Sequence, residues 1–170
     1  MTITVLGLIS AAGMQGQVDQ YQVKAFFLYN FARYVQWPAQ TFASATDSIA
    51  ICILGRNPFG TGLEQAISGK IVEGRSLVVR EISALPAQCS CNILFVAGPE
   101  RKRFQSGAAA LRESGVLTVG ETPGFAKEGG VINFKLEDGK VRFEINVDAA
   151  AQERLHISSK LLSLAQIVKQ

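Results

Sequence analysis

The sequence lacks the residues on which most catalytic sites depend. It has a single histidine, His156, and its acidic residues are dispersed along the chain. Nucleophilic catalysis needs a base beside the nucleophile, and no nucleophile-elbow motif accompanies His156. A histidine at a helix entrance is more often a structural hydrogen bonder. Because no close pair of carboxylates stands out either, we expect no catalytic residue and no enzyme activity.

Charge of one sign and long apolar runs are also scarce. The formal net charge is +3 over 170 residues, and the only basic cluster is residues 101–103. No aromatic residue interleaves that cluster, so nucleic-acid binding is not expected. Apart from the first twelve residues, no apolar run approaches the roughly eighteen residues of a membrane span. An apolar fraction of 48% fits one globular domain, which we expect over residues 13–170.

Residues 1–12, MTITVLGLISAA, form a short apolar run that ends in small residues. Small residues in this place suit signal peptidase, although the positively charged start of a complete signal peptide is missing. We interpret the run as the remnant of an export signal. The mature chain would then work in the periplasm.

Cysteine is rare, with only Cys52, Cys89 and Cys91 in the chain. Export would place these thiols in an oxidising compartment. A bond between Cys89 and Cys91 is awkward because they are two positions apart, and a bond from Cys52 to one of them is more plausible. In the alternative, all three are reduced and buried. With one histidine and no fourth sulfur, we expect no zinc site and no other metal.

Aromatic residues are concentrated in one stretch, residues 21–38, YQVKAFFLYNFARYVQWP. It holds seven of the fourteen aromatic residues and the only tryptophan. Spacings of three and four predict a helix with one buried face, made of Val23, Phe27, Asn30, Phe31 and Tyr34. That face is widened by Phe26, Leu28, Val35 and Trp37. We expect most of these residues to be core and some to line a cleft or a partner surface.

The rest of the chain alternates between strand and helix patterns. Strands are expected at 49–54, 76–82, 92–97 and 116–119, with helices at 61–68 and 100–113. Two alternating runs around Asp138-Gly139 predict a type I′ hairpin. One or two helical turns at 148–154 and a last helix from Ser158 or Ser159 to about Val168 follow. We expect a Rossmann-like α/β fold: a mixed sheet with a C-terminal antiparallel hairpin and helices on both faces.

The turn from Gly55 to Gly62 follows a strand and precedes a helix, as phosphate-binding loops do. It is not a P-loop because Thr61 stands where the lysine should be. It also lacks the dinucleotide fingerprint because Asn57 replaces the second glycine. We interpret it as a plain turn, with a weak anion site as the alternative, and we expect no cofactor.

Four stretches, in order, resemble the YfiR-like family of periplasmic repressors of membrane diguanylate cyclases. They are VKAFFLYNFARYVQWP at 23–38, ICILGRNPFG at 51–60, CNILFV at 91–96, and GGVINF, VRFEIN and LHISSKLLSLA within 129–165. The resemblance implies a homodimeric α/β protein that binds the periplasmic sensor domain of an inner-membrane cyclase and is captured by an outer-membrane lipoprotein. It also implies a Cys52–Cys91 disulfide. Cys89 is an extra thiol, and no cysteine follows Cys91 to form the second disulfide of the well-studied repressor.

We place the partner surface at the start of the last helix and on the hairpin, where residues at element ends could accept an aromatic anchor. The candidates are His156, Ile157, Ser158, Leu161, Phe134 and Phe143. A core role is an equal alternative for Leu161 and the two phenylalanines. The alternative function is a periplasmic sensor of a small ligand, a nucleotide or an aromatic metabolite, in a pocket framed by the aromatic helix and the Gly55–Gly62 turn.

Overall fold

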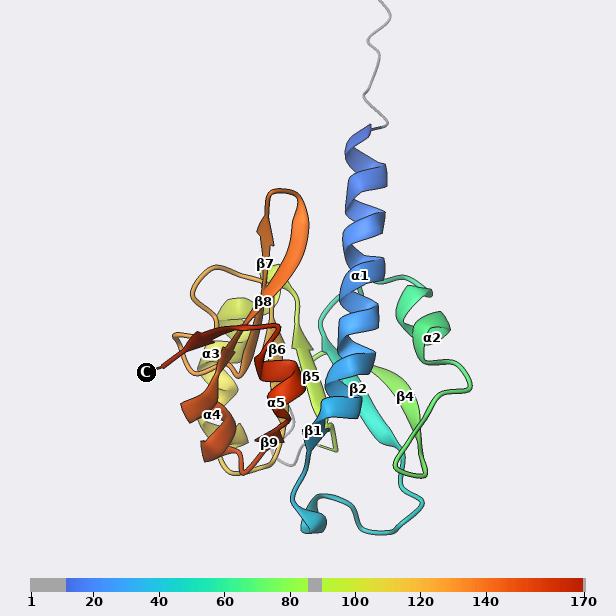
Figure 1. The fold of residues 1–170 in the computed structure, drawn as a ribbon, viewed down its shortest axis with the longest axis vertical. Coiled ribbons are helices and arrows are strands. Elements are labelled where there is room, and N and C mark those ends of the chain that lie inside the picture. Colours follow the sequence, from blue (N-terminus) through green and yellow to red (C-terminus); the bar gives the residue numbers. More distant parts are fainter. Residues whose placement is uncertain (1–11, 86–89, 170) are drawn as a thin grey trace, which may run out of the picture.

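A mixed sheet of eight strands, in the order β10-β8-β7-β6-β5-β2-β4-β3, organises the chain (Figure 1). The structure is a computed structural model that describes residues 12–85 and 90–169. Residues 1–11, which hold most of the expected export signal, and Cys89 lie outside the described residues.

The centre of the sheet is parallel and buried. β2 (Ile49–Leu54) pairs in parallel with β4 (Arg75–Ile82) and β5 (Ile93–Val96), and β5 pairs in parallel with β6 (Leu117–Gly120). Every residue of β2 is buried, as its continuous apolar run predicts. Alternate β2 residues enter two separate hydrophobic clusters, Ile51 and Ile53 in one and Cys52 and Leu54 in the other. The α/β prediction is confirmed.

Helices cover both faces of this sheet. The larger cluster contains side chains of α1 (Ala12–Tyr34), α2 (Gly62–Ile67) and α5 (Ser159–Leu162), while the smaller cluster contains Phe104 of α3 (Arg101–Gly107). The other short elements are η1 (Ala39–Thr41), β3 (Ile71–Val72), η2 (Gly98–Glu100), η3 (Ala108–Leu111) and α4 (Val147–Gln152).

A disulfide joins Cys52 in β2 to Cys91, two residues before β5, with their Cα atoms 5.7 Å apart. This is the pairing that the family resemblance implied. Both cysteines are buried in the smaller hydrophobic cluster. The bond therefore crosslinks two neighbouring parallel strands below the surface of the protein.

The hairpin forms as expected from β7 (Ile132–Glu137) and β8 (Lys140–Asn146). Asp138 and Gly139 have φ values of 51° and 74°, and two positive values are what a type I′ turn requires. Ile132, Phe134, Val141, Phe143 and Ile145 are buried, whereas Leu136 near the tip is 51% exposed.

The aromatic helix α1 lies beside this hairpin and continues past the sheet at its N-terminal end (Figure 1). Phe27 and Phe31 pack against Phe134 and Phe143, with ring centroids 5.1 to 6.1 Å apart. Val23, which we placed on the buried face, and Phe26, which widens it, are instead 41% and 60% exposed.

Three expected helix ends are wrong. α1 ends at Tyr34, and β1 (Val35–Gln36) then pairs with β9 (His156–Ile157). The segment 100–113 changes from α-helix to 3₁₀-helix after Gly107, its poorest helix former. The last helix stops at Leu162, and β10 (Gln166–Val168) joins the sheet beside β8. An open sheet edge offers backbone partners that outweigh the helical spacing of the final apolar residues.

Candidate functional site

Four of the expected partner residues lie together where α1 ends, and only one of them presents its side chain fully to solvent. His156 is exposed, Ser158 is half-buried, and Ile157 and Leu161 are 8% and 1% exposed. The Ser158 hydroxyl accepts a hydrogen bond from the Leu161 N–H and caps α5. Ile157 and Leu161 therefore anchor the segment that presents His156.

The other two expected residues, Phe134 and Phe143, lie elsewhere. They are 1% and 3% exposed and face Phe27 and Phe31 on earlier turns of α1. A partner could reach these two rings only if α1 moved away from the hairpin. Their role in partner binding stays a prediction.

Two exposed cations and two half-buried tyrosine rings gather at the C-terminal end of α1, beside the β1–β9 pair that carries His156. The Arg33 guanidinium lies 5.2 Å from the ring centroid of Tyr34 and 5.6 Å from that of Tyr29, and the Lys160 ammonium lies 5.2 Å from that of Tyr34. A hydrogen bond with Lys160 is the main cause that lowers the pKa of Tyr34. We name these five residues, Tyr29, Arg33, Tyr34, His156 and Lys160, the cationic–aromatic surface.

Sequence reasoning missed most of this surface because it assigned Tyr34 to the buried helix face. Tyr34 is half-buried, and the helix ends there because β1 pairs with β9, with Val35 opposite Ile157 and Gln36 opposite His156. The Ser158 N–H also donates to the Tyr34 carbonyl at 2.9 Å. The LHISSKLL motif already contained Lys160, but its distance from Arg33 in sequence hid the cluster.

The start of the aromatic stretch, in the middle of α1, buries its charge instead. The Lys24 ammonium lies 2.7 Å from Oε2 of Glu121, while the Tyr21 hydroxyl and the Gly98 N–H donate to Oε1 at 3.2 and 3.0 Å. Lys24 is 7% exposed. Burial, followed by the charge of Glu121 and its hydrogen bond, raises the pKa of Tyr21 to about 12. Lys24 and Glu121 are 97 positions apart, so no local motif indicates this pair.

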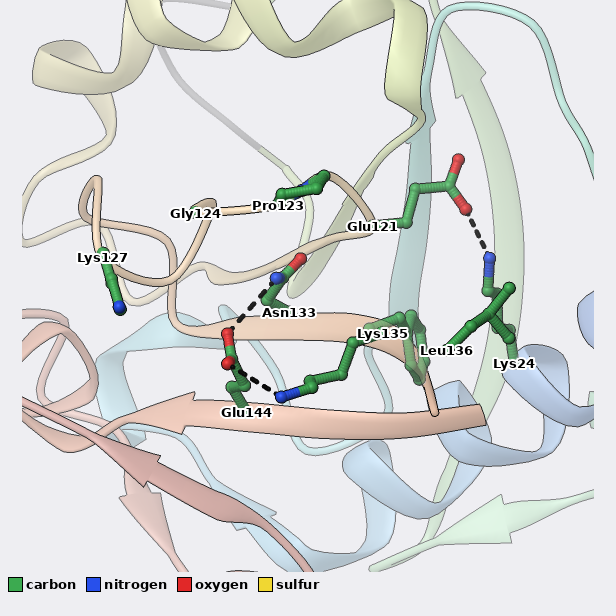
Figure 2. A pocket seen from close by; sticks show the side chains of 10 residues that line it. Lys24, Glu121, Pro123, Gly124, Lys127, Asn133, Lys135, Leu136 and Glu144 are labelled. Carbon is green, nitrogen blue, oxygen red and sulfur yellow. Dashed lines mark hydrogen bonds and ion pairs between the residues drawn. The ribbon is translucent and has the colours of Figure 1, made fainter. Parts of the chain in front are cut away.

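This buried pair lies at the carboxyl edge of the parallel strands, because Glu121 follows β6 and Gly98 comes shortly after β5. Ligands of open α/β sheets bind outside this edge. Here a cleft of about 410 Å³ opens beside the pair, lined by residues of α1, of the loop after β6 and of the hairpin (Figure 2).

The Gly55–Gly62 turn is braced by its own side chains. The Asn57 amide donates to the Gly60 carbonyl at 3.1 Å and accepts from the Phe59 N–H at 2.8 Å. Phe59 is buried and packs edge-on against Tyr21 and Phe95. Its ring fills the space between the turn and α1 in which the sequence suggested a pocket.

Residues 12–85 and 90–169 contain no group of three or more histidine, cysteine, aspartate or glutamate residues that could hold a metal ion. Within the same described ranges, no helix has the length and hydropathy that a bilayer span requires.

The model of the DUF4154 family, described as YfiR/HmsC-like, matches residues 21–166. The chain belongs to this YfiR/HmsC-like family. The family is periplasmic and regulatory, and membership supports a role as a regulator of diguanylate cyclase signalling. No protein of curated function matches the chain.

Two solved structures show the same fold as this YfiR/HmsC-like chain. A conserved domain protein from Vibrio cholerae has a TM-score of 0.54 at 10% identity, with 86% of this chain and 60% of that chain covered. An ABC domain from Streptococcus pneumonia, in complex with L-Trp, has a TM-score of 0.51 at 9% identity, with 90% and 60% covered. The chain thus spans 60% of the length of each, and identities this low show the fold alone.

Proposed function

We propose that this protein represses an inner-membrane diguanylate cyclase by binding the cyclase's periplasmic sensor domain, and that it makes and breaks no covalent bond. An outer-membrane lipoprotein captures it and so releases the cyclase. The chain works as a homodimer. Family membership supports the regulatory role, and the cationic–aromatic surface is the structural observation that carries the binding role.

The cationic–aromatic surface suits recognition because its charges are both exposed and held in place. Arg33 precedes β1 and Lys160 follows β9, so the antiparallel pairing places both at the same end of the two strands, next to the ring of Tyr34. Cations held over an aromatic ring lose less side-chain freedom when a partner binds. Tyrosine and arginine are also the residue types that most often dominate binding energy.

The positive charge of this surface predicts the charge of the partner's surface. Among the described residues of the surface there are two permanent cations and one histidine, and no carboxylate. A complementary patch on the cyclase sensor domain would be acidic and would carry an aromatic or apolar centre. Such complementarity speeds association and excludes partners of the wrong charge.

The experiment is a double charge reversal, His156→Glu with Lys160→Glu. Binding of the purified cyclase sensor domain should weaken by at least about tenfold, since like charges would meet at the interface. Both side chains are exposed, so the free energy of unfolding should change by less than about 0.5 kcal/mol. The matched control, Lys102→Glu with Arg112→Glu on the α3 side, should bind normally.

The cellular measurement is the concentration of cyclic-di-GMP. Deletion of the gene should raise it while the cyclase is expressed, and a copy with the double reversal should not restore the low concentration. An unaltered concentration after deletion would refute repression. Equal loss of binding in the control variant would instead refute this surface as the contact.

A further inference from the structure

The cleft beside the Lys24–Glu121 pair exists because β6 ends before β7 does. β6 pairs with β7 only through Val119 and Gly120, which lie opposite Ile132 and Asn133. The chain then leaves the sheet as the loop of residues 121–130, and β7 continues with no strand on that side. The cleft of about 410 Å³ lies between this loop, β7 and α1 (Figure 2), and its volume is that of small-molecule sites.

Apolar side chains form part of the cleft wall. Phe134 is buried at its inner end, and Leu136 and Pro123 are exposed at its margin. An apolar wall with a few converging polar groups is the usual composition of a ligand site.

Asn133 brings an unpaired acceptor to this cleft. Asn133 is 2% exposed, and its amide nitrogen donates to Oε2 of Glu144 at 3.4 Å. Because a carboxylate only accepts, the amide nitrogen must face Glu144 and the amide oxygen must face away from it. Figure 2 shows this oxygen turned toward the loop that carries Pro123.

The amide oxygen of Asn133 and the hydroxyl of Thr122 are buried without a hydrogen-bond partner, and in the described part of the chain no other buried side-chain polar atom shares this state. Thr122 lies between Glu121 and Pro123, two residues of the cleft wall. Buried polar groups in folded proteins are nearly always paired. Because Asn133 lines the cleft, its unpaired oxygen indicates that something outside the chain completes it.

Three lysines and two glutamates set the charge of the cleft. Lys24 is paired with Glu121, and Lys135 is paired with Glu144 and Glu137. Lys127 lines the cleft and forms no ion pair with any described residue. Its ammonium lies on the side of the cleft that holds Asn133 and Glu144 (Figure 2). One positive charge is therefore available to a ligand.

We propose that this cleft binds a small organic acid. Its carboxylate or phosphate pairs with Lys127, an O–H or N–H group donates to the amide oxygen of Asn133, and its apolar body lies against Phe134 and Leu136. The site is separate from the cationic–aromatic surface and does not depend on repression of a cyclase. Bound there, the acid would contact both α1 and the hairpin.

The test uses the whole purified protein and four probes of similar size, and it follows the NMR shifts of the Asn133 side-chain amide and of the backbone amides of residue 122 and residues 124–128. 4-Hydroxybenzoate carries anion and donor, 4-hydroxyphenyl phosphate replaces only the carboxylate by a phosphate, benzoate lacks the donor and 4-hydroxybenzyl alcohol lacks the anion. We expect 4-hydroxybenzoate or 4-hydroxyphenyl phosphate to bind, and benzoate and the neutral alcohol to bind about tenfold more weakly. The two anions decide between carboxylate and phosphate.

Variants of Lys127 then test whether its ammonium contacts the acid. Lys127→Gln should weaken binding of the acid about tenfold, and Lys127→Arg should restore most of it. The matched control is Lys140→Gln, which removes an exposed lysine of the β7–β8 hairpin that does not line the cleft. The proposal is overturned if neither acid shifts these amides up to about 10 mM, which would leave water as the occupant. Equal weakening in the Lys140→Gln control would also overturn it.

Discussion

The aromatic stretch of α1, residues 21–34, treats the same residue types in opposite ways at its two ends. Near its start, Lys24 and Tyr21 are turned inward, and the carboxylate of Glu121 binds both. At its end, Arg33 and Tyr34 are joined by Lys160, and the cations remain open to solvent. A charge that is paired inside the fold stabilises the structure, whereas a charge held at the surface remains available to a partner. The two ends should therefore respond differently to substitution.

The disulfide belongs to neither of these two regions, and its removal should cause the largest loss in the free energy of unfolding. It closes a loop with a sequence separation of 39. Replacing Cys52 and Cys91 by alanine should lower the free energy of unfolding by about 4 kcal/mol on the chain-entropy account. Urea denaturation with and without a reductant measures this loss. The reductant should have no further effect on the double variant, and a marked effect would point to a different bond.

Removal of one buried cation should cause the next largest loss in the free energy of unfolding. Lys24→Met leaves Glu121 buried with only the Tyr21 hydroxyl and the Gly98 N–H as donors. We expect a loss of about 3 kcal/mol in the free energy of unfolding, because an uncompensated charge remains in the interior. The matched change at the other end, Lys160→Met, should cost less than about 0.5 kcal/mol. Equal losses in the two variants would show that the two ends do not differ.

The sequence predicted the centre of the fold because its signals are local. A continuous apolar run marks β2, and Asp138-Gly139 alone specifies the hairpin turn. β10 was taken for helix because its strand depends on pairing with β8, where Ile167 lies opposite Ile145. Helical spacing within the final residues carries no trace of that distant partner.

The candidate sites, like the fold, were predictable from the sequence only where their signals are local. Lys24 and Glu121 are 97 positions apart, so no motif could reveal their pairing. His156 was found from the LHISSKLL motif, but Tyr34 became visible as a surface residue only once β1 was known to end the helix. Asn133 fits an alternating strand pattern as an outward residue, yet it is 2% exposed and lines the cleft.

The smallest effect, and the most direct contrast between the ends, is the ionisation of Tyr21 and Tyr34. The pKa of Tyr21 is raised to about 12 and that of Tyr34 is lowered, so Tyr34 should lose its proton first and Tyr21 later. The raised pKa of Tyr21 means that the fold favours its neutral form. The contribution of Tyr21 to stability is therefore complete below pH 10 and is lost as pH rises through about 12. The lowered pKa of Tyr34 means that the fold favours its ionised form. The contribution of Tyr34 to stability is present above pH 10 and disappears as pH falls through its folded pKa.

Tyrosine ring carbon shifts, followed by NMR from pH 8 to 12, measure both ionisations separately. Lys160→Gln should return the pKa of Tyr34 toward its ordinary value and leave Tyr21 unchanged, because Lys160 is the first cause of the Tyr34 shift. Glu121→Gln should lower the pKa of Tyr21 only in part, since burial is the larger cause there. If Tyr21 ionised before Tyr34, α1 would not hold its first half against Glu121 in solution, and the cleft beside that carboxylate would lose one of its walls.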